Sequence, residues 1–275
     1  MPARRKSRRY ASPEQAYPSR KIPQVARRHA AKINALHETL HQDFIGYSGS
    51  SIAVRATSSI DIALWDIFGQ AVGKPIYQLL GGKVRDKIRA YNTCAGTGYA
   101  KGSSNIDRKR ASQLGVVTDG DYEDLFAFLN KPEELVHSLK EMGFTAMKIW
   151  PFDKAAIRAG GQTVMGKDLH EGVDIFRRAR EAAGSDFDIM LEMHSLWSVP
   201  AATTIAHAVE EFSPFWIEDP FRHESTDALV RFKQSINSPL TTGETTGTRW
   251  DHHRLLKSNA IDHLMIDPGW VGGIT

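Results

Sequence analysis

The sequence predicts an α/β fold, an incomplete TIM-type (β/α)7β barrel that follows a mostly helical N-terminal region. Short apolar runs alternate with helical patterns along the second half of the chain, which is typical of a parallel sheet covered by helices. Three glutamates that each end an apolar run also lie 26 residues apart, namely Glu192, Glu218 and Glu244. That interval is about one strand, one helix and two short loops, so it brings successive strand ends to one mouth of a barrel.

Two helical patterns precede the predicted barrel. Apolar residues at loose helical spacing predict a helix over residues 24–46. A stronger pattern over residues 52–72 has one broad apolar face, formed by Ile60, Ala63, Leu64, Ile67 and Phe68. Gly73 ends this second helix. We expect residues 24–87 to form one domain.

Six strands separated by helices are predicted over residues 88–275, after the boundary at Gly81-Gly82. A polar loop is expected over residues 96–120. A closed barrel of this type has eight strands, so about 50 more residues would be needed, and we expect strands 7 and 8 to be missing. The predicted strands span residues 88–94, 146–150, 187–193, 215–218, 240–242 and 263–266, and the helices span 132–142, 168–183, 200–212, 225–235 and 250–257.

The N-terminal arm is strongly basic. Residues 1–32 hold ten Lys or Arg residues and one acid, Glu14, whereas the rest of the chain holds 25 basic and 31 acidic residues. The net charge of +3 therefore conceals a mildly acidic body. We expect residues 1–23 to be a solvated, disordered leader. The run Arg4–Arg9 leaves open a transit-like leader, or contact with anionic lipid or nucleic acid, the last being the weaker interpretation.

The overall composition is that of an ordinary water-soluble globular chain. Of the 275 residues, 41% are hydrophobic and 24% are charged, which allows a large core. No apolar stretch approaches the roughly 18 residues that a membrane span needs, so we expect no membrane partner. The one cysteine, Cys94, excludes an internal disulfide and fits a reducing compartment, so we expect a cytoplasmic protein with a buried structural thiol at Cys94.

Carboxylates that converge on one barrel mouth repel each other unless a cation lies between them. A hard divalent cation bound through oxygen, Mg²⁺ above all, is the usual solution in proteins. Glu192, Glu218 and Glu244 are therefore candidate metal ligands. The plain alternative is that they are three surface acids spaced by chance.

Several segments resemble one known family. The stretch Ser59-Ile-Asp-Ile-Ala-Leu-Trp-Asp-Ile-Phe-Gly69 resembles the capping domain of the enolase superfamily, in its mandelate racemase/muconate lactonizing branch. Phe215-Trp-Ile-Glu-Asp-Pro220, Thr242-Gly-Glu244 and Ile266-Asp-Pro-Gly-Trp-Val-Gly-Gly-Ile274 resemble its fourth, fifth and sixth strand motifs. The resemblance covers about residues 30–275 and implies an incomplete α+β capping domain, because the family's first antiparallel sheet is not found. We thus expect a chain truncated at both ends.

The resemblance implies that Glu192, Glu218 and Glu244 bind one Mg²⁺ per active site. Bound to that ion, a carboxylate substrate can lose its α proton, because the cation stabilises the charge of the enediolate. Members with Asp at the first ligand position are common, so Glu192 is a departure, although it keeps an oxygen ligand. The substrate implied is a small carboxylate, and the family is often homo-oligomeric.

Lys148 matches the first lysine of the family's Lys-x-Lys motif. The resemblance implies that its positive charge lies near the substrate carboxylate and the metal ligands. Trp150 replaces the second lysine, which serves as the base in racemases and cycloisomerases. An indole N–H cannot accept a proton at neutral pH, so this replacement counts against racemisation.

His194 lies two residues after Glu192, and residues i and i+2 of a strand point to the same side. The stretch Glu192-Met-His-Ser-Leu-Trp197 resembles acid-sugar dehydratases, which implies acid/base work for His194. A structural or substrate-binding imidazole is the alternative. Asp267 matches an aspartate that pairs with a histidine on the seventh strand of this family, and that histidine is expected beyond Thr275.

The sequence therefore predicts a hydro-lyase of carbohydrate acid catabolism. Abstraction of the α proton and loss of the β-hydroxyl would convert an aldonic or aldaric acid into a 2-keto-3-deoxy acid. The alternatives are a racemase, epimerase or cycloisomerase on the same fold, and a catalytically inactive, truncated homologue.

Overall fold

A computed structural model describes residues 32–42, 52–96 and 123–275. The chain divides into two compact units. The first contains residues up to Asp86 together with Thr245–Arg249 and Ile266–Thr275, and the second contains Lys87–Glu244 and Trp250–Met265. The domain limits inferred from the sequence stay predictions. The leader expected over residues 1–23 and nearly all of the polar loop expected over 96–120 lie outside the described residues.

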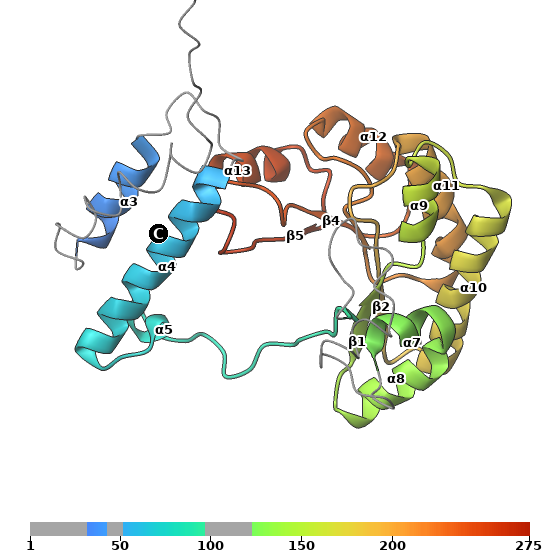
Figure 1. The fold of residues 1–275 in the computed structure, drawn as a ribbon, viewed down its shortest axis with the longest axis horizontal. Coiled ribbons are helices and arrows are strands. Elements are labelled where there is room, and N and C mark those ends of the chain that lie inside the picture. The colour runs from blue at the N-terminus through green and yellow to red at the C-terminus, as the bar shows by residue number, and fades with distance from the viewer. Residues whose placement is uncertain (1–31, 43–51, 97–122) are drawn as a thin grey trace, which may run out of the picture. The chain divides into compact units, whose positions relative to one another are not determined.

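The described residues at the N-terminal side of the first unit, up to Leu79, form three helices (Figure 1). The predicted helix over 52–72 is confirmed as α4, and α3 lies within the helix predicted over 24–46. The two helices pack through Ile33, Leu36 and Leu64, with Ile60, Trp65 and Phe68 around them. The apolar face of α4 is narrower than predicted, because Ile67 is 51% exposed. The helices of this unit are α3 (Ile33–Gln42), α4 (Ile52–Val72) and α5 (Ile76–Leu79).

A second, polar face of α4 binds the segment at residues 271–275. The Asp61 carboxylate is fully buried and accepts hydrogen bonds from the backbone N–H groups of Ile274 (2.6 Å) and Thr275 (3.0 Å). Ser58 Oγ accepts another from Gly272 N at 2.9 Å. Gly273 has φ +106°, and a Cβ there would lie 2.3 Å from Asp61 Oδ2. Two motifs far apart in the sequence are thus complementary because one supplies a buried acceptor and the other supplies N–H groups and a glycine.

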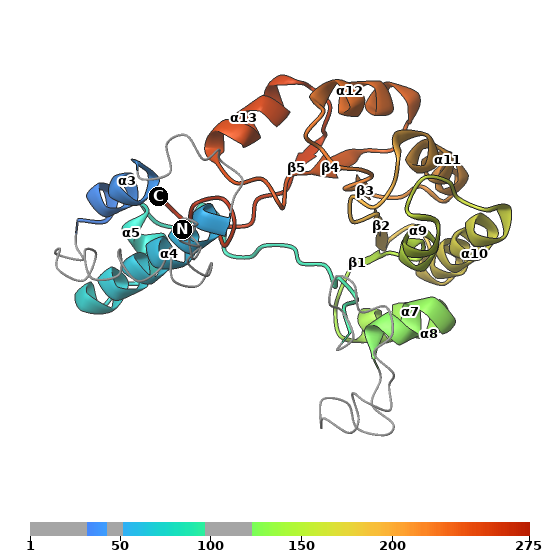
Figure 2. The same ribbon diagram turned by 45° about the horizontal axis from the view of Figure 1, so that its top comes forward.

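The second unit contains a parallel sheet with the order β1-β2-β3-β4-β5 (Figure 2). This confirms the predicted α/β class with a parallel sheet. Five of the six predicted strands form, most of them shorter than expected. The strand predicted over 88–94 is reduced to one bridge between Asn92 and Met147, because the chain turns away at Cys94 with φ +52°. The strands are β1 (Ala146–Ile149), β2 (Asp188–Glu192), β3 (Ile217–Glu218), β4 (Leu240–Thr242) and β5 (His263–Leu264).

Helices connect the strands of the second unit. Five were predicted from the sequence, whereas α7 and the short α9 were not. No helix in the described part of the chain is both long enough and apolar enough to cross a bilayer. The helices are α7 (Asp124–Asn130), α8 (Pro132–Glu141), α9 (Asp153–Ala159), α10 (Gly166–Ala183), α11 (Val199–Val209), α12 (Thr226–Ser235) and α13 (Arg249–Lys257), with a 3-10 turn at Glu210–Phe212.

Strand alternation gives the sheet two faces of different character. Because successive side chains point to opposite sides, every second residue packs against the helices. The residues of the helical side are apolar and belong to the main core; they include Cys94, Met147, Ile149, Ile189, Leu191, Ile217 and Leu240. The opposite face carries Ala146, Lys148, Met190, Glu192, Trp216 and Glu218. Lys148, Glu192 and Glu218 therefore share one face of the sheet. Cys94 is buried as predicted, and burial raises the pKa of its thiol.

Replacing Asp61 is expected to release the 271–275 segment from α4. Asp61→Ala leaves the N–H groups of Ile274 and Thr275 without their acceptor, which should cost about 3 kcal/mol of unfolding free energy. Urea unfolding measures the loss, and amide hydrogen exchange at Ile274 reports it locally. Asp66→Ala on the exposed side of α4 is the matched control, expected to change stability by less than about 0.5 kcal/mol. Equal stability of the two variants would contradict this account.

Candidate active site

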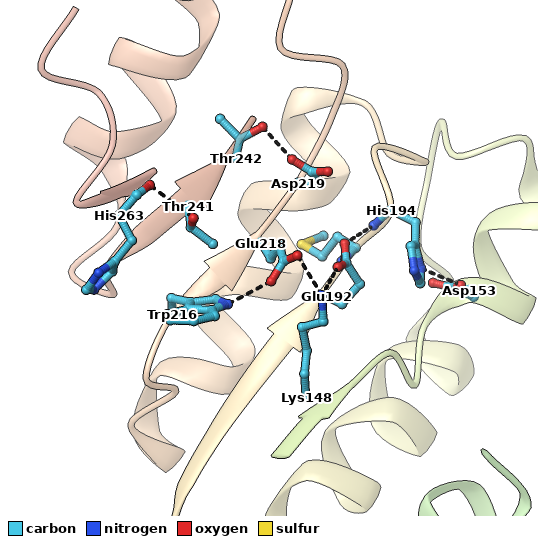
Figure 3. A network of polar contacts seen from close by, with 11 residues as sticks. Lys148, Asp153, Glu192, His194, Trp216, Glu218, Asp219, Thr241, Thr242 and His263 are labelled. Carbon is cyan, nitrogen blue, oxygen red and sulfur yellow. Dashed lines mark hydrogen bonds and ion pairs between the residues drawn. The ribbon is translucent and has the colours of Figure 1, made fainter. Parts of the chain in front are cut away.

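A buried lysine bridges two buried glutamates on the polar face of the sheet (Figure 3). Lys148 Nζ lies 2.8 Å from Glu192 Oε2 and 2.6 Å from Glu218 Oε1. The side chains are 7%, 1% and 0% exposed, respectively. The sheet register explains the arrangement, because Glu192 at the end of β2 pairs directly with Glu218 at the end of β3. The spacing of 26 residues therefore correctly predicted that these two carboxylates meet at adjacent strand ends.

The remaining carboxylate oxygens of this pair also have donors. Glu192 Oε1 accepts from the backbone N–H groups of Met193 at 3.1 Å and His194 at 2.8 Å. Glu218 Oε2 accepts from Trp216 Nε1 at 2.9 Å. Hydrogen bonds from the protein itself therefore fix the orientation of both carboxylates.

The electrostatics of the pair are those of two acids that share one cation. Burial alone would raise the pKa of Glu192, but the charges of Lys148 and His194 outweigh it and lower that pKa. Burial and the negative charge of Glu192 raise the pKa of Glu218 to about 9, against the opposing charge of Lys148. Burial disfavours the Lys148 ammonium, yet the two glutamates raise its pKa above the ordinary value. Lys148 thus stays charged at neutral pH.

Asp219 is a further buried acid that the sequence reasoning did not single out. It follows Glu218 with a left-handed backbone, φ +43°, and its carboxylate accepts a hydrogen bond from Thr242 Oγ1 on β4. Burial and the charge of Glu192 raise its pKa to about 7, although the Thr242 hydrogen bond acts in the opposite direction. The feature of the sequence that could have pointed to Asp219 is its position in the motif Phe215–Pro220.

His194 does not lie on the strand as predicted. β2 ends at Glu192, and His194 has φ +50°, so the argument from strand alternation does not apply. The ring instead turns toward α9, where Nδ1 lies 2.8 Å from Asp153 Oδ2 (Figure 3). It also packs edge to face on Trp150, with 5.4 Å between the ring centroids. Burial alone would lower the His194 pKa, but the hydrogen bond to Asp153 and the charge of Glu192 raise it. Asp153 escaped the sequence analysis because α9 was not predicted.

Glu244 and Asp267 are not joined to the Lys148 network by any hydrogen bond or ion pair of the described residues. Glu244 lies in the turn after β4 and is half-buried, and its charge still raises the pKa of Asp219. Asp267 belongs to the first unit, where its Oδ1 accepts from Gly269 N at 2.7 Å in a turn. Their predicted roles as metal ligand and catalytic residue stay predictions.

The residues present suit a hard divalent cation by their chemistry. Glu192 and Glu218 offer carboxylate oxygens, the donors that Mg²⁺ prefers, and they already hold a cationic group between them. Burial, and after it the charge of Glu192, raises the pKa of Glu218, so a cation beside this carboxyl would favour its ionised form. Glu244 does not complete a set of three ligands with them, since no three His, Cys, Asp or Glu side chains within the described ranges lie close enough together to hold a metal ion.

Comparison with known proteins identifies the family. Residues 132–275 match the family model described as enolase C-terminal domain-like, and residues 14–81 match the mandelate racemase/muconate lactonizing enzyme N-terminal domain. The superfamily implies a divalent metal, and the distant relatives include hydro-lyases that act on sugar acids.

Three similar proteins illustrate the relationship. The chain is 30% identical to a D-galactonate dehydratase of Klebsiella pneumoniae, over 89% of this chain and 55% of that protein. It is 25% identical to an arabinonate dehydratase of Saccharolobus solfataricus, over 88% of this chain and 54% of that protein. A crystal structure of an enolase of the mandelate racemase subgroup from Agrobacterium tumefaciens is 37% identical, with a TM-score of 0.72 over 90% of this chain and 58% of that one. The chain spans about half the length of the curated relatives it matches. It belongs to the enolase superfamily, in its mandelate racemase/muconate lactonizing enzyme branch.

Proposed function

We propose that the protein acts as a Mg²⁺-dependent dehydratase of sugar acids, which converts an aldonic or aldaric acid into a 2-keto-3-deoxy acid. The observation that carries the proposal is the buried Glu192–Lys148–Glu218 cluster at adjacent strand ends. The sugar-acid dehydratases among the relatives support the substrate class. Because the chain covers about half of those relatives, the activity of the whole enzyme is part of the proposal.

Glu192, Glu218 and Glu244 would hold the metal, and a divalent cation there supplies positive charge to the substrate carboxylate as the α proton leaves. Lys148 adds a permanent positive charge beside it. Lys148 cannot serve as a base near neutral pH, because the two glutamates raise the pKa of its ammonium.

His194 is the side chain of this network best suited to exchange a proton with the substrate. The pKa of an ordinary imidazole lies near neutrality, and Asp153 and Glu192 raise that of His194. A neutral His194 can take the α proton, and the imidazolium so formed can donate that proton to the departing β-hydroxyl, which then leaves as water. Trp150, at the position of the family's second lysine, offers no second base, and this favours elimination over racemisation.

The proposal predicts formation of a 2-keto acid. Purified protein would be incubated with Mg²⁺ and a panel of aldonic and aldaric acids, and 2-keto acid would be measured with semicarbazide. We expect one or a few substrates to react and EDTA to abolish the reaction. In D₂O, exchange of the α proton without loss of water would instead indicate an epimerase. Absence of both product and exchange across the panel would overturn the proposal.

The metal assignment predicts a binding defect that does not depend on turnover. Glu244→Gln removes one anionic ligand, so we expect its affinity for Mn²⁺, titrated calorimetrically, to fall about tenfold or more. Glu244 is half-buried and free of the Lys148 ion pairs, so the variant should fold normally. Glu224→Gln is the control, because Glu224 pairs with Arg222 on the surface. Equal Mn²⁺ affinity of both variants would exclude Glu244 as a ligand.

Lys148→Met should reveal the repulsion between Glu192 and Glu218. Removal of the ammonium leaves two adjacent buried carboxylates, which is expected to cost about 3–5 kcal/mol of stability. Mg²⁺ can replace part of that charge, so added Mg²⁺ should raise the Tm of the variant more than that of the wild type. The exposed Lys167→Met on α10 serves as the control. A Lys148→Met protein as stable as wild type without metal would show that the bridge is not required.

A further inference from the structure

The segment Trp150–Asp153, which runs from the end of β1 to the first residue of α9, contacts the His194 side chain through two of its residues. Asp153 Oδ2 lies 2.8 Å from Nδ1 of the ring, and the side chains of His194 and Asp153 are only 9% and 20% exposed. The Trp150 indole packs edge to face on the same ring, and Phe128 packs edge to face on Trp150 in turn, at 5.1 Å. The contacts with Asp153 and Trp150 therefore both restrict the imidazole.

The main chain of His194 is fixed as well. Its backbone N–H donates to Glu192 Oε1 at 2.8 Å, and the neighbouring Ser195 N–H donates to the Asp219 carbonyl oxygen at 2.7 Å. The left-handed backbone at His194 and Ser195 turns the chain out of the sheet. This turn directs the ring toward α9, so that one end of the residue contacts the glutamate cluster and the other contacts Asp153.

The chemistry of the Asp153 contact selects one form of the imidazole. An ionised carboxylate is an acceptor only, so Nδ1 must carry the proton that it donates to Oδ2. In the neutral ring the lone pair that can accept a proton is then on Nε2, and in the charged ring Nε2 carries a proton. A carboxylate at this position also stabilises the imidazolium and keeps the ring from rotating, as in the serine protease triad.

We propose that Asp153 is a positioning residue, which holds His194 in the Nδ1–H form and thereby assigns proton exchange with the substrate to Nε2. The inference deepens the proposed function and rests on it for the identity of the reaction. Asp153 and His194 together form an acid/base pair located beside Trp150, at the strand end where the family motif has its second lysine. Trp150 acts with Asp153 by supporting the ring through its edge-to-face contact.

The ring form of His194 can be measured without any turnover. Long-range ¹H–¹⁵N spectra of protein labelled at histidine distinguish protonated from unprotonated ring nitrogens, and loss of signals in His194→Gln assigns the residue. At a pH where the ring is neutral, we expect wild-type His194 to carry its proton on Nδ1. Asp153→Asn should shift the ring toward the Nε2–H form, because the amide can donate to Nδ1. The control Asp168→Asn changes a carboxylate that pairs with Arg158 outside this network.

Kinetics provide the second readout. We expect Asp153→Asn to lower kcat by about 10²- to 10⁴-fold with a KM within about threefold of wild type, and Asp153→Glu to restore part of the loss. Asp168→Asn should retain the wild-type kcat. An Nε2–H form in wild type, or a spectrum unchanged in Asp153→Asn, would overturn the positioning role. A wild-type protein that shows the Nδ1–H form but turns over none of the sugar acids would overturn the proposed function and leave the positioning of the ring standing.

Discussion

The contact of Lys148 with Glu192 and Glu218 is the interaction on which the second unit depends. Parallel pairing places the two glutamates opposite each other at the ends of β2 and β3, where both are almost fully buried. Two carboxylates in such a place repel strongly, because the low-dielectric surroundings screen them poorly. A cation between them is therefore a requirement of this register, and Lys148 meets it from the neighbouring strand. A divalent ion would meet the same requirement more fully.

Strand alternation connects this requirement to the core. Met147 and Ile149 flank Lys148 and point to the helices, while Leu191 precedes Glu192 and does the same. A slip of one residue in any strand would bring apolar side chains to the polar face and charges into the core. The position of the charged cluster is thus fixed by the apolar residues between its members, so that the same alternation that buries the core also assembles the site.

The sequence allowed prediction of the periodic features and little of what depends on the loops. The spacing of 26 residues correctly placed Glu192 beside Glu218, because strand and helix lengths repeat along the chain. The direction of the His194 side chain could not be predicted, because a left-handed turn begins at His194 itself, two residues after the end of β2. Asp153 was missed for a related reason. Its helix, α9, is seven residues long, too short for a clear periodic signal, and its partner lies 41 residues away.

Under the proposed function, Trp150 in place of the family's second lysine moves the proton-transfer group from the end of β1 to His194, after β2. Lys148 contacts two glutamates that raise the pKa of its ammonium. The indole of Trp150 has no basic nitrogen. The residues at the end of β1 therefore supply a positive charge and an aromatic ring, but no base. That ring supports His194, whose other contact, Asp153, lies three residues further along the same segment. The segment from Trp150 to Asp153 thus supports His194, which follows the end of β2. Under the proposed function, we therefore expect a change at Asp153 to alter proton transfer more than substrate binding.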